Sequence, residues 1–355
     1  MRPITATIDV RALRHNYGVA QKLTRKSEVI AVVKANAYGH GVSCVARALS
    51  HADGYAVVEL EAGVRLREAG LRQRIVLLEG FFEPQELEVI VRHKLATVIH
   101  TVEQLDMLHA LSQDAALDVL VKLNTGMNRL GFQPEDFAAA LARVRAMPGV
   151  GRITLMTHFA NADDARGIEW QLERFQCAAA GESLPRSLAN SAAILRYPES
   201  HAEMVRPGIM LYGCSPFAES TAAQLDLQPV MTLSSEIIAV RALAAGDTVG
   251  YGGLFTAQVP TRLGVVACGY ADGYPRHACT GTPVLVGGRL TRTLGRVSMD
   301  MLFVDLSGID EARVGTPVVL WGQGNPVENV ASAAGTVGYE LLCALAPRVR
   351  IIEKM

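Results

Sequence analysis

The sequence predicts a parallel (β/α)8 barrel of the TIM type, followed by a smaller, mostly antiparallel β domain. Three observations support this α/β fold class. Apolar, strand-like runs alternate with amphipathic helical segments through the first two thirds of the chain. Polar residues recur at the points where those strands end. Near residue 228 the helices fade, and glycine turns then separate successive strand-like runs.

The predicted barrel occupies residues 10–227. Eight strands within roughly 200 residues fit a closed barrel better than an open doubly wound sheet. The expected strands are 29–33, 54–58, 75–78, 96–99, 117–123, 153–157, 186–189 and 203–206. The expected helices are 42–49, 59–69, 84–94, 102–111, 134–147 and 169–180.

The predicted β domain occupies residues 228–355, after a connecting segment at 219–228. Pro283 and Pro317 each begin a strand, a position where a proline breaks no ladder hydrogen bond. A strand at the N-terminus, within residues 1–9, is left over, and we expect it to join this domain. The other expected strands are 230–242, 263–268, 283–286, 289–294, 301–305 and 317–321.

Composition excludes several classes of partner. The 355 residues include 34 basic and 35 acidic side chains, so the net charge of −1 favours neither nucleic acid nor an anionic membrane. No apolar run approaches the roughly 20 residues of a membrane span, and the first residues lack a secretory signal. The six cysteines show no zinc-ligand spacing, so we predict no metal site and reduced thiols in a cytoplasmic protein.

Lys34 is the first candidate for chemistry. It stands where the β-branched run 29–33 stops, before a turn that contains two glycines. Burial at a strand end favours the neutral amine of a lysine, which can form a Schiff base or take up a proton. The alternative is a side chain that extends from the strand end into solvent.

Further polar residues follow other predicted strands, and a TIM barrel carries its chemistry at these carboxyl ends. Taken singly, each has a simple structural explanation. Asn190 can form a turn, His158 can be a core histidine, and Arg206 can be a surface ion-pair partner. Their common location at one barrel mouth favours a site. The residues are Lys34, Lys122, Asn124, His158, Asn190, Ser191 and Arg206.

Two segments are suited to binding an anion: they follow the last two predicted barrel strands and contain Ser191 and Gly208. Barrels often bind phosphate there through backbone N–H groups. The Ser191 hydroxyl can donate a hydrogen bond, and Gly208 allows close approach of the backbone. A Schiff-base lysine and a phosphate site on one rim suggest pyridoxal phosphate as cofactor.

The chain resembles the alanine racemase family over essentially its whole length. Nine segments carry the resemblance in the family's order, which is far more specific than any one of them. They are Val33–Gly41 (VKANAYGHG), Lys122–Gly131 (KLNTGMNRLG), Thr157–Ala160 (THFA), Asn190–Ala192 (NSA), Val205–Ile209 (VRPGI), Val249–Gly252 (VGYG), Gly269–Tyr274 (GYADGY), Val297–Asp300 (VSMD) and Gly338–Glu340 (GYE).

The resemblance implies a role for each matching residue. Lys34 and Tyr251 would be the two bases acting on the pyridoxal phosphate aldimine of alanine, and Lys122 would be carbamylated. Arg129 and the Met299 backbone would contact the substrate carboxylate. The entrance would be lined by Tyr270, Arg276, Arg296 and Asp300. The cofactor-binding residues would be Lys34, Tyr38, His158, Asn190, Ser191, Arg206, Gly208, Ile209 and Tyr339.

The resemblance also implies a homodimer in which Tyr251 enters the partner's site. The substrate would be alanine, and the product would serve D-alanine biosynthesis or degradation, between which the sequence does not decide. A broader-specificity amino-acid racemase of the same fold is the main alternative. The others are a basic amino-acid decarboxylase, a non-catalytic pyridoxal phosphate-binding protein and a cofactor-free Schiff-base aldolase.

Overall fold

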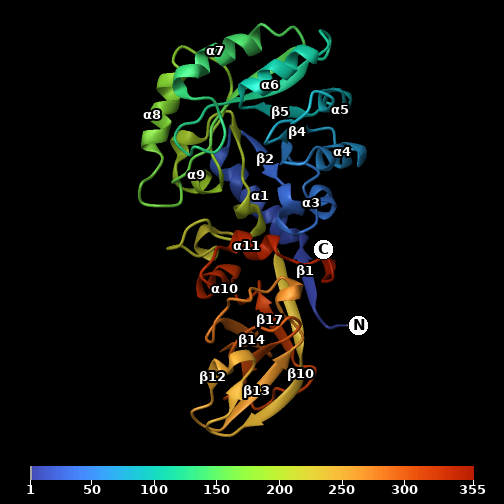
Figure 1. Ribbon diagram of the computed structural model, residues 1–355, viewed down its shortest axis with the longest axis vertical. Helices are drawn as coiled ribbons and strands as arrows, with labels where there is room; N and C mark the ends of the chain where they lie inside the picture. Colours follow the sequence, from blue (N-terminus) through green and yellow to red (C-terminus); the bar gives the residue numbers. More distant parts are fainter. Residues whose placement is uncertain (1) are drawn as a thin grey trace.

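The protein consists of a closed barrel and a separate β domain, as the sequence predicts. A computed structural model describes residues 2–355. Figure 1 shows the barrel in the upper part of the molecule and the β domain in the lower part, with α11 between them. Among residues 2–355, no helix has both the length and the apolar character needed to cross a membrane.

Eight parallel strands form the barrel in chain order. The first strand pairs with the last, with Val29 opposite Val205, and this pairing closes the barrel. The barrel strands are β2 (Glu28–Val32), β3 (Gly54–Val57), β4 (Arg74–Leu77), β5 (Ala96–Ile99), β6 (Leu117–Lys122), β7 (Val150–Met156), β8 (Arg186–Ser187) and β9 (Met204–Val205).

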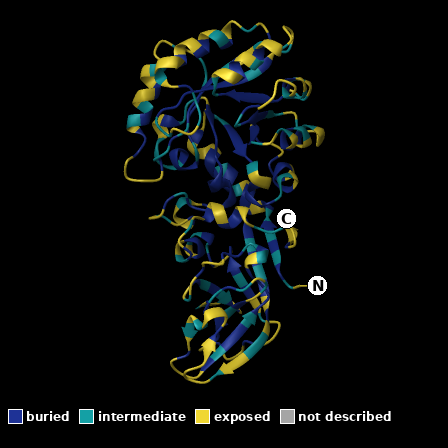
Figure 2. Ribbon diagram, in the orientation of Figure 1, coloured by how far each residue is buried: buried dark blue, intermediate teal, exposed yellow. Residues whose placement is uncertain are grey.

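Helices surround the barrel and hide its strands from solvent. Figure 2 shows buried strands inside and exposed residues on the outer faces of the helices. This is the arrangement expected when β-branched strands are buried on both faces. The main helices are α1 (Val10–Thr24), α3 (Val42–Ala48), α4 (Leu60–Glu68), α5 (Glu86–Arg92), α6 (Val102–Met107), α7 (Pro134–Arg145), α8 (Glu169–Ala178) and α9 (Ser191–Arg196).

The β domain is built on one sheet with the order β15-β14-β17-β10-β1-β18, and β13 and β16 extend it from β10. All its neighbouring strands are antiparallel except β1 and β18. Its strands are β1 (Thr5–Asp9), β10 (Met231–Leu243), β13 (Thr261–Val266), β14 (Pro283–Val286), β15 (Arg289–Arg292), β16 (Leu302–Asp305), β17 (Pro317–Trp321) and β18 (Arg350–Lys354), beside the small pair β11 (Thr248–Val249) and β12 (Phe255–Thr256).

The N-terminal strand links the two parts of the molecule. β1 lies between β10 and β18, and α1 follows it immediately as the first helix on the barrel. The Asp9 carboxylate caps α1 by accepting from the N–H groups of Arg11 and Ala12. Buried Asn16 donates to the carbonyls of Leu211 and Gln228, so α1 holds the chain before and at the end of the connection between the domains.

The helices α1 and α9 were not among those expected, and two further features differ from the sequence-based picture. The β domain retains two helices, α10 (Val327–Ala333) and α11 (Gly338–Cys343), where we expected helices to fade. Both are short, and tertiary packing decides such segments more than propensity does. The second difference lies in the turn that we expected after β2: its residues form α2 (Lys34–Tyr38), a left-handed helical turn.

Candidate active site

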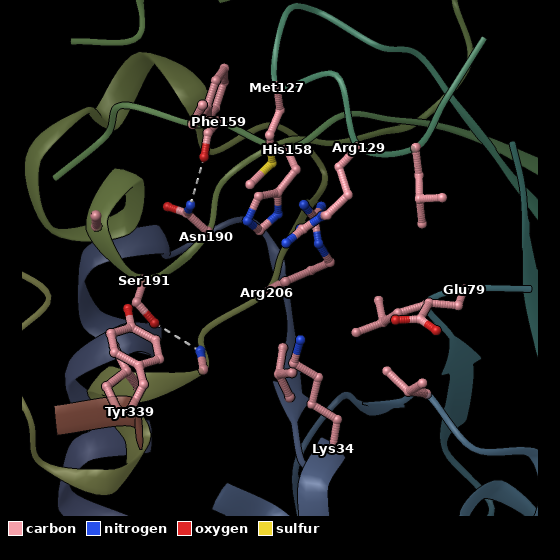
Figure 3. A pocket seen from close by; sticks show the side chains of 18 of the residues that line it. Lys34, Glu79, Met127, Arg129, His158, Phe159, Asn190, Ser191, Arg206 and Tyr339 are labelled. Carbon is pink, nitrogen blue, oxygen red and sulfur yellow. Dashed lines mark hydrogen bonds between the residues drawn. The ribbon is translucent and has the colours of Figure 1, made fainter. Parts of the chain in front are cut away.

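A cavity of about 590 Å³ opens at the carboxyl ends of the barrel strands. It is lined by most of the residues predicted from sequence, together with Tyr339 from α11 of the β domain. Figure 3 shows Lys34 pointing toward the space in which Arg129, His158 and Arg206 gather. The predicted residues that meet here are Lys34, Tyr38, Lys122, Arg129, His158, Asn190, Ser191, Arg206, Gly208, Ile209 and Tyr339.

The turn that carries Lys34 has an unusual backbone. Ala35, Asn36, Ala37 and Tyr38 have φ values of 51°, 52°, 55° and 50°. Only asparagine among these residue types enters this left-handed region with any ease, and each other residue costs about 1–2 kcal/mol there. The left-handed turn brings Lys34 at its start and Tyr38 at its end to the same cavity. Strain of this kind concentrates at functional sites.

Ser191 and Gly208 form a compact polar corner of the cavity. The Gly208 N–H donates to Ser191 Oγ at 2.8 Å, and the Met210 N–H lies 3.4 Å from the same oxygen. A side chain at Gly208 would place its Cβ 2.6 Å from the Tyr38 hydroxyl oxygen, so Tyr38 would have to shift. Asn190 caps α9 by accepting from the Ala193 N–H. Hydroxyls and backbone N–H groups converge here, which is a donor set suited to a phosphate.

Arg206 is fixed from behind the cavity. Its guanidinium donates to Ser187 Oγ at 2.6 Å, to the Thr157 carbonyl at 2.7 Å and to the Leu188 carbonyl at 3.3 Å. Burial lowers the pKa of Arg206 to about 10, so it stays protonated at neutral pH. Arg206 has no carboxylate partner among the residues that the structure describes. A buried cation without an anion is costly, and a bound anion or an aromatic nitrogen acceptor would relieve that cost.

The charge of Arg206 contributes to lowered pKa values of His158 and Lys122. Burial, followed by the charges of Arg206 and Lys122, holds the pKa of His158 well below its usual value, so its imidazole is neutral. Burial, followed by the charges of Arg206 and Arg129, lowers the pKa of Lys122 to about 8. A measurable share of Lys122 is therefore the neutral amine at physiological pH.

Seven predicted site residues lie outside the cavity of their own chain. Tyr251, in η5 (Tyr251–Gly253), is 70% exposed and Met299 is 53% exposed, both on the surface of the β domain. Asn124 is buried after β6, where its side chain donates to Asn128 Oδ1. The seven are Asn124, Tyr251, Tyr270, Arg276, Arg296, Met299 and Asp300.

The cavity also contains residues that the sequence-based reasoning did not select. Glu79 directly follows the predicted strand 75–78, so the rule that selected the other strand-end residues could have found it. Cys343 comes from the unpredicted helix α11 and carried no such signal. Ser187 and Thr157 act beneath the cavity through Arg206, and only their three-dimensional contacts identify them.

A lysine at a strand end and a polar corner of hydroxyl and backbone N–H groups share one cavity at the barrel rim, and a β domain is attached; together they define a two-domain barrel protein with an enzyme-like site. Family models described as the N-terminal and C-terminal domains of alanine racemase match residues 8–216 and 230–353. The chain therefore belongs to the alanine racemase family and is an isomerase.

Individual relatives agree with this assignment. An alanine racemase from Nitrosospira multiformis is 60% identical, covering 98% of this chain and 99% of the relative. The crystal structure of the biosynthetic alanine racemase from Pseudomonas aeruginosa is 49% identical with a TM-score of 0.98, and each chain is covered fully. The alanine racemase from Acinetobacter baumannii, 41% identical and also fully covered, has a TM-score of 0.95.

Proposed function

We propose that this chain interconverts L-alanine and D-alanine with pyridoxal phosphate bound to Lys34, using Lys34 and Tyr251 as two bases. The family works with pyridoxal phosphate. The observation that carries the proposal is the placement of Lys34 and the Ser191–Gly208 corner on one cavity. A lysine that binds an aldehyde and a donor set that binds phosphate are the two ends of a site for this cofactor.

Residues of the cavity fit the remaining parts of the cofactor. Ser191, Tyr38, Tyr339 and the Gly208 and Ile209 backbone would hold the phosphate. Arg206 would donate to the pyridine nitrogen, since an arginine offers only donors. Neutral His158, with Asn190 behind it, would lie beside the ring. When bound, the cofactor withdraws electrons from the α-carbon of alanine and so makes its proton removable.

Racemisation then requires a base on each face of the α-carbon. The Lys34 amine would remove or return the proton on one face. Tyr251 is the candidate for the other face, yet it is 70% exposed and outside the cavity of its own chain. A second copy of the chain, docked with its β domain against the barrel mouth, would bring Tyr251 and Met299 into the site. The catalytic unit would then be a homodimer.

Arg129 would orient the substrate carboxylate, and Lys122 would orient Arg129. Both residues line the same cavity, and the charge of Arg129 contributes to the lowered pKa of Lys122. A carbamate on Lys122 would replace repulsion between two cations by attraction. Only a neutral amine reacts with CO₂, and the pKa of about 8 makes that amine accessible.

The shared site can be tested by mixing two inactive variants. In a mixed dimer of Lys34→Ala and Tyr251→Phe, one site has lost both bases and the other keeps both. Random reassortment makes half of the dimers mixed, so we expect about a quarter of parental racemase activity. Each variant alone should be inactive with L-alanine, measured by D-amino-acid oxidase coupling.

Two outcomes would overturn parts of this proposal. If the mixture stays inactive although reassortment is demonstrated by mass tags, the site is not shared between subunits. If the parental enzyme neither converts alanine nor shows the absorbance of bound pyridoxal phosphate, the proposed reaction is wrong. An active Lys34→Ala variant would contradict the role of Lys34.

A further inference from the structure

The left-handed turn α2 (Lys34–Tyr38) requires something to hold it. Four consecutive residues, 35–38, have positive φ. Three of them, Ala35, Ala37 and Tyr38, are residue types that avoid this region; the fourth is Asn36. Backbone bonds of the turn itself, such as Ala37 N–H to the Val33 carbonyl at 2.9 Å, would form equally well in a right-handed turn. They therefore do not explain the handedness.

His40 supplies contacts that depend on this handedness. Its side chain is fully buried, and Nδ1 lies 2.8 Å from the Tyr38 carbonyl and 3.1 Å from the Ala37 carbonyl. Carbonyls only accept hydrogen bonds, so Nδ1 must carry the proton. Nε2 then presents a lone pair, and it has no hydrogen-bond partner among residues 2–355. Reversing the turn would redirect both carbonyls and leave Nδ1–H unpaired as well.

The imidazole is itself fixed by aromatic packing. Its ring centroid lies 4.5 Å from that of Tyr212, and the Tyr212 ring stacks on Tyr38 at 4.7 Å. The Tyr212 hydroxyl donates to the Val32 carbonyl at 2.9 Å, at the end of β2. Tyr212 ends the segment η3 (Ile209–Tyr212), which begins directly after Gly208. His40 is thus braced against the loop that forms the anion corner.

We propose that His40 is a positioning residue, whose Nδ1–H bonds to the Ala37 and Tyr38 carbonyls hold the left-handed turn that places Lys34 and Tyr38 in one cavity. This inference rests on the proposed function, because it assigns to His40 a part in organising the cofactor site. If the turn is correct only in a fraction of molecules, the apparent affinity for the cofactor falls by that fraction.

Three substitutions separate the hydrogen bond from the packing. His40→Asn places an amide N–H where Nδ1 stands, and we expect the dissociation constant of pyridoxal phosphate to stay within about threefold of the parental value. His40→Phe keeps a ring but removes the donor, and His40→Gln moves the donor to the Nε2 position. Both should raise the dissociation constant about tenfold or more. Equilibrium dialysis of the full-length enzyme measures it, without reliance on turnover.

A rescue distinguishes positioning from general destabilisation. Ala35 is exposed at φ 51°, so Ala35→Gly removes left-handed strain without opening a cavity. Added to His40→Phe, it should recover about three- to tenfold in cofactor affinity. The matched control is Ala139→Gly, an exposed alanine in right-handed α7, which should recover nothing.

The results decide between distinct failures. If His40→Phe and His40→Gln bind pyridoxal phosphate like the parental enzyme, or if Asn loses as much as Phe, the inference is wrong. Equal rescue by both glycine substitutions would overturn it too. If His40→Phe does not fold, the comparison of Asn with Gln decides alone. Failure of the parental enzyme to bind pyridoxal phosphate would instead contradict the proposed function.

Discussion

The guanidinium of Arg2 donates two hydrogen bonds to the fully buried carboxylate of Asp272, at 3.0 and 3.1 Å, although 270 residues separate them in the chain. Arg348 and the Gly269 N–H donate to the same carboxylate at 2.7 and 2.9 Å. Asp272 thereby joins both ends of the chain to the segment η6 (Tyr270–Asp272) of the β domain.

Removing this carboxylate should weaken the β domain. Asp272→Ala leaves the Gly269 N–H and two arginines without their acceptor. Because both arginines are partly exposed and can rehydrate, we expect a loss of about 2–3 kcal/mol in the free energy of unfolding. Urea titration measures this loss. The exposed Asp114→Ala should change stability by less than about 0.5 kcal/mol, and equal effects of the two substitutions would contradict this role of Asp272.

Gly39 should tolerate no side chain, because of where it packs. Its φ is 78°, and a Cβ would overlap the Leu342 carbonyl of α11. Gly39→Ala should therefore cost about 3 kcal/mol or more and loosen α11, which carries Tyr339. Gly70 has a φ of 89° with nothing within 4 Å of its Cβ position, so Gly70→Ala should lose only about 1 kcal/mol. Similar losses from both, measured by urea titration, would show that contact with α11 is unimportant.

His40 should make the protein sensitive to acid. Burial lowers the pKa of its folded-state imidazole to about 4 from 6.5, and the ring packed against it, Tyr212, stays uncharged because burial raises its pKa. The unfolded state then binds the proton more tightly. The stability from neutral His40 is present above pH 6.5 and is lost as the pH falls toward 4, by about 3 kcal/mol in all. Asparagine does not titrate in this range, so between pH 7 and 4 the His40→Asn variant should lose about 3 kcal/mol less of its free energy of unfolding than the parental protein, measured by urea titration. If the two proteins show the same pH dependence, the buried imidazole of His40 is not neutral.

Lys122 should bind CO₂ and lose it in acid. Its pKa of about 8 supplies neutral amine, which disappears as the pH falls below that value. In ¹³C-bicarbonate, the parental enzyme should show a carbamate NMR signal that weakens from pH 8 to 6 and is absent in Lys122→Arg. Lys122→Ala should lose about tenfold or more in activity, because Arg129 loses its partner, and acetate should restore part of it. A carbamate signal that persists in Lys122→Arg would exclude this site.

Local patterns in the sequence were sufficient to predict most of the barrel strands and most of the residues that line the cavity. Apolar runs predicted the eight barrel strands because a parallel strand covered on both faces must be apolar throughout. Polar residues at the ends of those runs, such as Lys34 and Arg206, then had to meet at one rim, because all eight strands point the same way.

Only the tertiary structure decided how those residues are held. Nothing local predicts a left-handed turn at Ala35 and Ala37, because it depends on the buried His40, on Tyr212 and on the close approach of Leu342 at Gly39. The exposure of Tyr251 outside its own cavity is likewise a product of domain arrangement. Short-range propensities determine where strands and helices form. The strained left-handed turn and the position of Tyr251 relative to the barrel are instead determined by contacts between residues far apart in the chain.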